Sequence, residues 1–240
     1  MTKPFKFKEF TINQDKTAMK VGTDGVLLGA WCSVNEYPDS ILDIGSGTGV
    51  ISLMIAQRSD AMTIDAIEVE ENAYEQTVAN FEESDWGDRL YCYNATFLEF
   101  ADEIEEEGET YDLIVSNPPF YTDEYESEDA SRNKARFTSS LSFEELVVGV
   151  SKILSENGIF SIVLPFKEEV EFISLAKENS LFLNKVCRVK GNPTSETKRS
   201  LMEFSFNQTE IKIDSLTIEL ERHKYTEDYI NLTRDFYLKM

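Results

Sequence analysis

Short apolar runs alternate with stretches of helical spacing along most of this 240-residue chain, and this alternation limits the fold more than any other feature. Buried strands are predicted at 40–45, 63–69, 89–95, 111–117 and 158–164. Helices are predicted at 49–58, 71–84, 142–154 and 167–179. Repeated strand–helix–strand order predicts an α/β fold with a doubly wound, mostly parallel sheet that is Rossmann-like in its connections.

Two further β runs complete the predicted sheet. They lie at 181–190 and 199–207, and the loop KGNPTSETK between them suits antiparallel pairing at one edge. We therefore expect a seven-stranded sheet with an antiparallel edge pair. No domain boundary is visible in the sequence, so residues 1–240 are expected to form a single domain.

Residues that bind metals or form disulfides are few. Cys32, Cys92 and Cys187 are scattered without a CxxC pair, and His223 is the only histidine, so we expect buried thiols and no metal site. The N-terminus lacks an apolar signal region, and no run reaches the ~20 apolar residues of a membrane helix. A soluble cytoplasmic protein without a membrane partner is expected. The sequence does not determine the oligomeric state, for which a monomer is expected.

The net charge of −22 is concentrated in one part of the chain. Residues 57–131 contain 23 acids and two bases, whereas the remainder holds 22 acids and 21 bases. Within that remainder, residues 177–199 contain six bases and two acids. A solvated acidic face explains the first block, and a molecule that is acidic on one side and mildly basic on another is the alternative.

The segment LDIGSGTG follows the first of these predicted strands and opens a helix. Gly45, Gly47 and Gly49 allow a sharp turn and a close approach of a ligand to the backbone, as in NAD sites. Asp43 at the strand end favours a cationic ligand group over a phosphate. Glu68 ends the next strand, where an acid hydrogen-bonds ribose hydroxyls. Together they favour S-adenosylmethionine over NAD, because its amino-acid end is cationic and it has no pyrophosphate.

The segment SNPPF ends the predicted strand 111–117, where two prolines prevent further sheet pairing. Ligands of parallel sheets bind at the carboxyl ends of strands, so this segment is expected beside the glycine loop. The Asn117 side-chain oxygen and the Pro118 carbonyl can accept both N–H bonds of an aromatic amine or an amide, which makes its lone pair more available to a methyl group. Pro119 helps to fix that geometry, and Phe120 can stack on a planar substrate. The alternative is a proline turn with a core Phe.

With the glycine loop, Glu68 and the NPPF tetrad, the chain resembles class I S-adenosylmethionine-dependent methyltransferases of the branch that methylates amino groups. The resemblance implies methyl transfer without a metal ion. It leaves an adenine N6, a guanine N2 of rRNA and a protein glutamine as substrates, because enzymes for all three share the tetrad. A non-catalytic chaperone on this fold is a further alternative, against which the intact tetrad and glycine loop argue.

Segments at both ends of the chain narrow this choice. Residues 5–31, 188–204 and 225–240 resemble the tRNA(Val) adenine-N6 methyltransferase family, which methylates the adenine immediately 3′ of the anticodon. The resemblance implies a tRNA substrate. It also implies a Rossmann-like core, residues 39–240, and an N-terminal extension, residues 1–38, that closes over the cofactor.

The same resemblance assigns further cofactor contacts. Thr23 and Asp24 of the extension are implied contacts, with a helix cap as the alternative for Asp24. Methyltransferases of this class often bind the cofactor adenine with an acid after the third strand. This chain has Asn94-Ala95-Thr96 there, so the Ala95 backbone and Thr96 are the expected substitutes.

Phosphate contacts with RNA must come from local bases in so acidic a chain. The expected RNA-binding residues are Arg132, Lys134, Arg136, Lys190, Lys198 and Arg199. A charge cluster at the start of a helix is the alternative for the first three. A protein glutamine methyltransferase would need no basic surface and would suit the overall acidity. Against it, the glycine loop begins at Gly45 and leaves no room for a separate N-terminal recognition domain.

Overall fold

The computed structural model describes residues 3–119 and 141–240. The first part contains β1 (Phe5–Lys6), β2 (Thr11–Ile12), α1 (Thr23–Trp31), β3 (Ser40–Ile44), α2 (Val50–Arg58), β4 (Thr63–Ile67), α3 (Glu71–Glu82), β5 (Leu90–Tyr93), α4 (Phe97–Glu107) and β6 (Tyr111–Ser116). The second part contains α6 (Phe143–Ile153), β7 (Leu154–Pro165), the 3-10 turn η2 (Phe166–Glu168), α7 (Glu169–Glu178), β8 (Phe182–Lys190), β9 (Thr197–Ser205), β10 (Lys212–Thr217), β11 (Glu219–Glu221), β12 (Lys224–Tyr225) and α8 (Glu227–Thr233).

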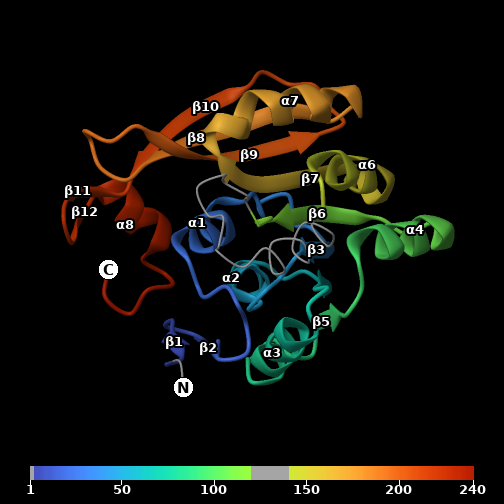
Figure 1. Cartoon of the computed structure of the whole chain (residues 1–240), viewed down its shortest axis with the longest axis horizontal. Coiled ribbons are helices and arrows are strands. Elements are labelled where there is room, and N and C mark those ends of the chain that lie inside the picture. The colour runs from blue at the N-terminus through green and yellow to red at the C-terminus, as the bar shows by residue number, and fades with distance from the viewer. Residues whose placement is uncertain (1–2, 120–140) are drawn as a thin grey trace, which may run out of the picture.

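Among the described residues, eight strands form one sheet in the order β10-β8-β9-β7-β6-β3-β4-β5 (Figure 1). Strand β9 runs antiparallel to its neighbours β7 and β8, and the other pairs in this sheet are parallel. Ser116 pairs with Ile44 on one side and with Ile162 on the other, so β3 and β6 end level while β7 continues to Pro165. The loops after β3, β4, β5 and β6 therefore meet at one edge of the sheet.

The predicted α/β fold is confirmed, with each of the seven predicted strands in the sheet. The sheet has eight strands, not seven, because Lys212–Thr217 adds β10 outside the predicted antiparallel pair β8 and β9. The sequence KIDSLT was not recognised as a strand, since in this edge strand only Leu216 is buried. Ser142 caps the predicted helix α6, with its hydroxyl accepting from the N–H of Glu145. The three cysteines are free, and Cys32 and Cys187 are buried.

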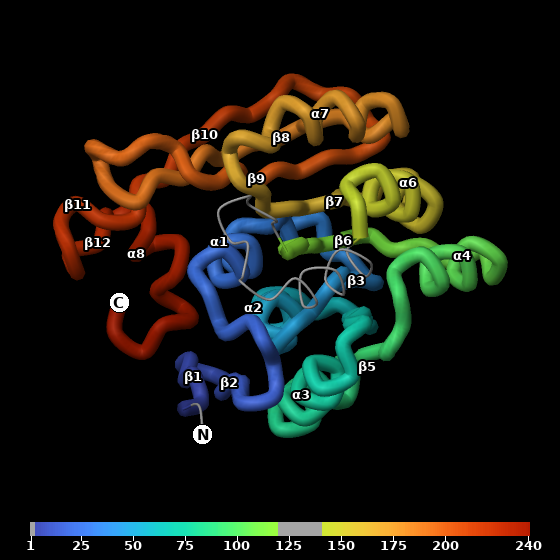
Figure 2. Tube along the Cα trace, in the orientation of Figure 1, coloured from blue at the N-terminus to red at the C-terminus, as the bar shows by residue number. Residues whose placement is uncertain are grey.

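Helices cover both faces of the sheet (Figure 1). One apolar cluster packs α1 and α2 against one face, and a second packs α4, α6 and α7 against the other. Helix α1 is buried from Gly25 to Ala30 because it contacts α2, α8 and the sheet strands β7 and β9. Phe7 near the start of the chain and Tyr237 near its end form an isolated β-bridge. Figure 2 shows the first and last segments on the same side of the molecule.

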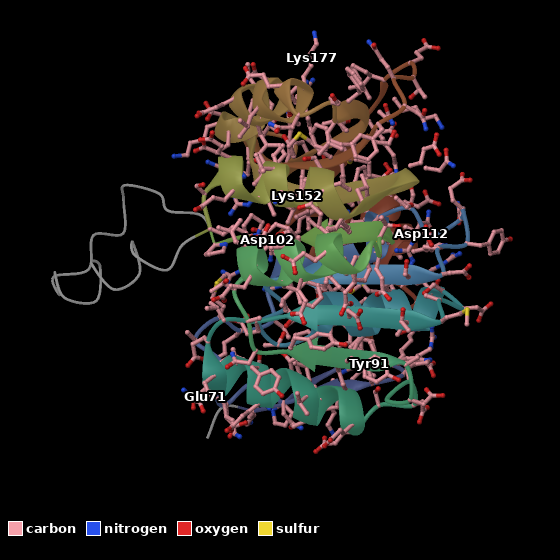
Figure 3. The ribbon with its side chains drawn as sticks, turned by 90° about the vertical axis from the view of Figure 1, so that its right-hand side faces the viewer. Glu71, Tyr91, Asp102, Asp112, Lys152 and Lys177 are labelled. Carbon is pink, nitrogen blue, oxygen red and sulfur yellow. The ribbon has the colours of Figure 1, made fainter. Side chains whose placement is uncertain are left out.

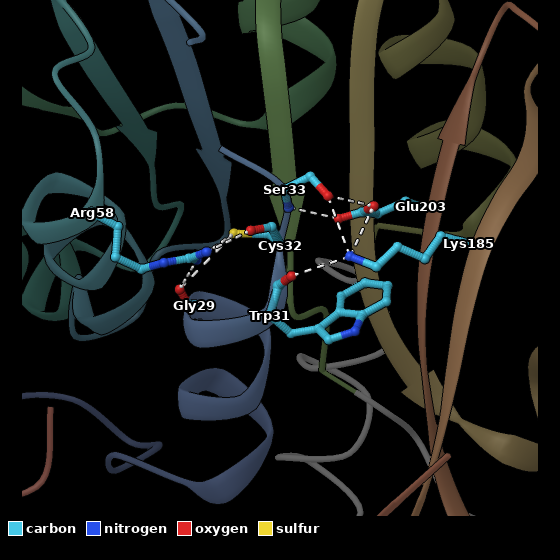
Figure 4. Close-up of polar contacts among 7 residues, drawn as sticks. All are labelled: Gly29, Trp31, Cys32, Ser33, Arg58, Lys185 and Glu203. Atoms are coloured by element: carbon cyan, nitrogen blue, oxygen red, sulfur yellow. Dashed lines mark hydrogen bonds and ion pairs between the residues drawn. The ribbon is translucent and has the colours of Figure 1, made fainter. Parts of the chain in front are cut away.

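A polar cluster fixes the C-terminal end of α1 to the sheet (Figure 4). Glu203 on β9 is buried and accepts hydrogen bonds from the Ser33 backbone N–H at 2.7 Å and the Ser33 hydroxyl at 2.9 Å. The Lys185 ammonium lies 3.4 Å from the Glu203 carboxylate and 4.0 Å from the centroid of the Trp31 ring. Arg58 of α2 donates to two backbone carbonyls at the end of α1. The C-terminal end of α1 is thus bonded both to β9 of the sheet and to α2.

Candidate active site

A cavity of about 450 Å³ opens at the carboxyl edge of the sheet. It is bounded by the loops after β3, β4, β5 and β6, by the first turn of α6, and by the segment Thr17–Met19 before α1. This is the position at which doubly wound sheets bind ligands. The glycine loop, Glu68 and the SNPP segment, which are far apart in the sequence, therefore meet in one cavity as predicted from their places at strand ends.

The glycine loop turns through three positive φ angles. Gly45, Gly47 and Gly49 have φ of 74°, 58° and 75°, in the left-handed region that favours glycine. The Gly45 N–H donates to the Ile67 carbonyl at 2.9 Å, which ties the loop to the end of β4. A Cβ atom at Gly49 would lie 2.7 Å from the Phe81 ring, so packing also requires glycine there. At Gly45 and Gly47 a Cβ atom would meet no described atom within 4 Å, and both residues line the cavity.

Glu68 stands in the cavity wall with its carboxylate held from two sides. Its Oε2 accepts from the Gly47 N–H and its Oε1 from the Glu70 N–H, each at 2.9 Å. The Asn94 amide donates to the Glu68 carbonyl at 2.8 Å and joins the loop after β5 to the same wall. Each carboxylate oxygen keeps a second lone pair, so Glu68 can still accept from a pair of ligand hydroxyls.

Asp43 precedes the wall residue Ile44 and is fully buried, so it does not itself line the cavity. Its Oδ2 accepts from the Ser52 hydroxyl at 2.6 Å and the Ser52 N–H at 3.2 Å. Its Oδ1 has no hydrogen-bond partner among the described residues. Burial raises the pKa of Asp43 to about 6, the hydrogen bonds from Ser52 oppose that shift, and the charge of Glu68 adds to it. A contact of Asp43 with a cationic ligand group stays a prediction.

Acidic side chains dominate the charged part of the cavity wall. Glu68, Glu70 and Glu145 line it, and the described lining includes no lysine or arginine. A pyrophosphate would be repelled by this wall, whereas a cationic ligand would be attracted. The observed charges therefore fit S-adenosylmethionine and disfavour NAD.

Exposed apolar side chains line the part of the cavity beside the loops after β4 and β5. Met19, Val69 and Leu98 line the cavity with 63%, 52% and 38% of their surface exposed. Ala95 lies in the same wall. Large apolar residues so exposed at a concave site suit a flat, apolar ligand surface such as an adenine ring.

Asn117 follows the last residue of β6 and faces the same cavity. Within the described part of the chain, no hydrogen bond engages its side-chain amide, so the amide is available to a ligand. Its Nδ2 lies 3.8 Å from where a Cβ of Gly25 would stand, which places the first turn of α1 next to it. Pro118 is buried and Pro119 is exposed, and both line the cavity. Phe120 lies outside the described residues.

Thr17–Met19 is one part of the cavity wall that was not predicted from the sequence. The Lys20 ammonium donates to the carbonyls of Gln14 and Thr17, so these hydrogen bonds lie within the loop that contains the segment. The Lys16 N–H donates to Oε1 of Gln76 on α3 at 3.0 Å. Since the Lys16–Gln76 bond joins residues 60 positions apart, no local sequence pattern could have located the segment beside α3.

Asp24 and Thr96, two of the predicted cofactor contacts, have side chains bonded to other residues of the protein. Thr23 and Asp24 do not line the cavity, and Asp24 forms an ion pair with Nε of Arg199 at 2.8 Å. Thr96 lines the cavity, but its hydroxyl donates to Glu99 at 2.6 Å and caps α4. A cofactor contact through the Thr96 backbone stays a prediction.

Three of the predicted RNA contacts lie at the same sheet edge, beyond β6. Lys190 is the last residue of β8, and Lys198 and Arg199 are the second and third residues of β9. Arg199 pairs with Pro165 at the end of β7, the strand next to β6. The other three predicted RNA contacts, Arg132, Lys134 and Arg136, lie outside the described residues.

The acidic stretch, as far as it is described, builds the opposite end of the sheet. Residues 57–119 contain 18 acids and two bases and form β4, α3, β5, α4 and β6. Figure 3 shows Glu71 on α3 and Lys177 on α7 at opposite ends of the molecule. Most of these acids are exposed, as a solvated acidic face predicts, and their distance from β8 and β9 also agrees with a polarised molecule. Among them no group of three His, Cys, Asp or Glu side chains could hold a metal ion, and no helix is long and apolar enough to cross a bilayer.

Comparison with known proteins adds the following similarities. Residues 27–178 match the family model of the methyltransferase small domain. The chain is 57% identical over 237 residues to the tRNA1(Val) (adenine(37)-N6)-methyltransferase of Christiangramia forsetii, which covers 99% of this chain and 98% of that protein. It is 58% identical over 237 residues to the enzyme of the same name from Flavobacterium johnsoniae, covering 98% of this chain and 100% of that protein.

A solved structure shares the fold. A protein of Agrobacterium tumefaciens, described as a predicted O-methyltransferase, superposes with a TM-score of 0.67 at 18% identity, covering 89% of this chain and 96% of that one. At this identity the likeness concerns the fold alone.

Proposed function

This chain belongs to the family of tRNA1(Val) (adenine(37)-N6)-methyltransferases, and we propose that its cavity transfers a methyl group from S-adenosylmethionine to N6 of an adenine in the anticodon loop of tRNA(Val). The observation that carries the assignment of the site is the position of Asn117. Its amide, unengaged within the described residues, opens on a cavity whose charged wall residues are acidic.

S-adenosylmethionine supplies an electrophilic methyl group on a sulfonium sulfur. Glu68 would accept hydrogen bonds from the ribose hydroxyls, and the Gly47 and Glu70 N–H groups already orient its carboxylate. Met19, Val69 and Leu98, which line the cavity with much of their surface exposed, would hold the adenine ring, together with the Ala95 and Thr96 backbone.

Charge holds the other end of the cofactor. Glu145 faces the cavity, and Asp43 is buried behind its wall with one oxygen unpaired by described residues. The buried charge of Asp43 would attract the ammonium and sulfonium charges, while Glu145, whose carboxylate accepts from the Ser142 N–H and hydroxyl, adds negative charge to the wall. The N-terminal residues 1–38 form an extension that closes over the 39–240 core, and Met19 supports this proposal by lining the cavity.

Asn117 and Pro118 prepare the acceptor. The Asn117 side-chain oxygen and the Pro118 carbonyl accept the two N–H bonds of the adenine amine, whose lone pair is otherwise delocalised into the ring. Acceptors fixed in advance cost little reorganisation during transfer. The product carries an extra proton that it loses to water, so no general base is required.

RNA reaches the cavity over the basic edge of the sheet. Lys190 and Lys198 at the ends of β8 and β9 lie where phosphates flanking the target adenine would pass. Arg199 contributes positive charge there while it is paired with Asp24. Arg132, Lys134 and Arg136 are proposed as further contacts from the sequence alone.

The test uses purified protein, tritiated S-adenosylmethionine, and separate pools of tRNA and cell protein from a strain lacking the gene. Label in tRNA, released on nucleoside digestion as N6-methyladenosine, is the expected result. Label released as N2-methylguanosine, or label in the protein pool alone, would overturn the adenine assignment. The protein pool outcome would make a glutamine amide the acceptor.

A further inference from the structure

Phe166 is an exposed aromatic residue one strand away from the proposed acceptor site. It follows Pro165, the last residue of β7, and 40% of its surface is exposed. Strand β7 is the parallel neighbour of β6, which ends before Asn117. Because β7 continues beyond the residue that pairs with Ser116, the ring of Phe166 stands at the carboxyl edge of the sheet, outside the cavity.

A fixed guanidinium lies over this ring. The Arg188 Cζ is 5.8 Å from the Phe166 ring centroid, within the range of a cation–π contact. Arg188 donates from Nε and Nη2 to Glu169, which is 4% exposed and also accepts from the Ser200 hydroxyl. The pair therefore forms a rigid platform, since the buried carboxylate orients the guanidinium and the guanidinium covers part of one face of the ring.

The surroundings of the platform carry cations. Lys167 follows Phe166 and is 3.4 Å from Glu168, while Lys190 and Lys198 end and begin the two strands beyond it. The nearby acids in the sequence are Glu168, Glu169, Glu171 and Glu196, of which Glu169 is paired with Arg188. This local balance differs from that of residues 57–119, so the platform repels a phosphate chain less than the acidic end of the sheet does.

Methylation of a loop adenine creates a need for such a platform. The target base must leave its stack to reach Asn117, and the bases on either side then lose a stacking partner. Single-stranded RNA loops are commonly bound by aromatic rings and arginine planes that replace this stacking, with cations on the backbone.

We propose that Phe166 and Arg188 form a stacking site for an unpaired nucleotide adjacent to the target adenine, with Lys190 and Lys198 contacting its phosphates. This inference rests on the proposed function and adds to it a second base-binding site outside the cavity. The platform contributes to binding of the RNA loop and leaves the methyl-transfer step and the cofactor unchanged.

The test compares Phe166→Ala with the wild type on a synthetic anticodon stem-loop, measuring KM and kcat for the RNA, direct RNA affinity, and S-adenosylmethionine affinity. Loss of one base–aromatic stack predicts a rise of about 5- to 150-fold in the RNA KM and Kd. The kcat at saturating RNA and the cofactor Kd stay at the wild-type values. Phe166→Trp restores RNA affinity. Ile213→Ala, which removes another exposed apolar side chain on β10, is the matched control and changes neither.

Two outcomes separate this inference from the function on which it rests. If the wild type methylates the RNA and Phe166→Ala has the same KM and Kd, the stacking site is refuted and the proposed function stands. If the wild type neither binds nor methylates RNA while still binding S-adenosylmethionine, the proposed function and the stacking site are both refuted.

Discussion

Replacing Asp43 by Asn should separate the stability of the protein from its use of a buried charge. Asp43 is fully buried, and burial raises its pKa from 3.8 to about 6 against the opposing hydrogen bonds of Ser52. Asn has no charge to desolvate and can still accept from the Ser52 N–H and hydroxyl. At neutral pH the ionised Asp43 carboxylate lowers the stability of the folded state, and the substitution removes this destabilising charge.

The size and sign of the effect follow from linkage. Because the folded state holds this proton more tightly than the unfolded chain, stability is lost as pH rises from about 4 through about 6. A pKa raised from 3.8 to about 6 corresponds to a loss of about 3 kcal/mol in the unfolding free energy, and this loss is complete at pH values above the folded-state pKa. Between about pH 5 and pH 8, the unfolding free energy of the wild type should therefore fall by about 1 kcal/mol relative to Asp43→Asn.

Urea unfolding followed by the fluorescence of Trp31 and Trp86 measures this difference, at pH values above the sequence pI of about 4.4. Asp85→Asn, at an exposed carboxylate, is the control for the loss of one negative charge. A stability difference between wild type and Asp43→Asn that is the same at pH 5 and pH 8 would show that Asp43 does not titrate in this window. In the same variant, S-adenosylmethionine should bind several-fold more weakly at pH 8, and unchanged affinity would remove Asp43 from the cofactor site.

Four further changes test other parts of the molecule. Asn117→Ala should lower kcat by about 10²- to 10³-fold with the cofactor Kd unchanged, and near-normal turnover would contradict the role of the amide. The double variant Lys190→Glu and Lys198→Glu should weaken RNA binding and flatten its dependence on salt concentration, whereas cofactor affinity should not change. Glu203→Ala leaves Lys185 and a backbone N–H without their buried partner and should lower the unfolding free energy by about 2–3 kcal/mol in urea. Gly149→Ala puts a Cβ atom 2.4 Å from the Phe97 ring and should cost about 1–3 kcal/mol in the same assay.

Sequence reasoning located the elements whose burial is continuous and missed those that depend on distant partners. The strands at 40–45 and 111–117 were predicted because buried parallel strands are uninterrupted apolar runs, whereas β10 is an edge strand with one buried residue. In the site, the glycine loop and Asn117 meet because the carboxyl ends of parallel strands share one edge of the sheet.

The remaining site residues were beyond reach for a physical reason. Asp24 and Arg199 were assigned separately, one to the cofactor and one to RNA, yet they pair with each other across 175 positions of the chain. Thr17–Met19 reaches the cavity through bonds of its flanking residues to α3 and within its own loop, and Glu145 reaches it as the third residue of α6. Such contacts arise from tertiary packing, to which no local spacing corresponds.

The charge of −22 does not oppose an RNA substrate once its distribution is considered. From β8 to β5 the sheet order spans six interstrand steps, or about 29 Å at about 4.8 Å each. The Debye length is about 8 Å at physiological ionic strength, so the acidic end is screened from RNA bound over β8 and β9. At about 0.01 M salt the Debye length of about 30 Å covers that distance, and the acidic end then repels any RNA that does not approach over the basic edge. At low salt the acidity therefore favours an approach of RNA over β8 and β9, on the side of the sheet nearer to Asn117.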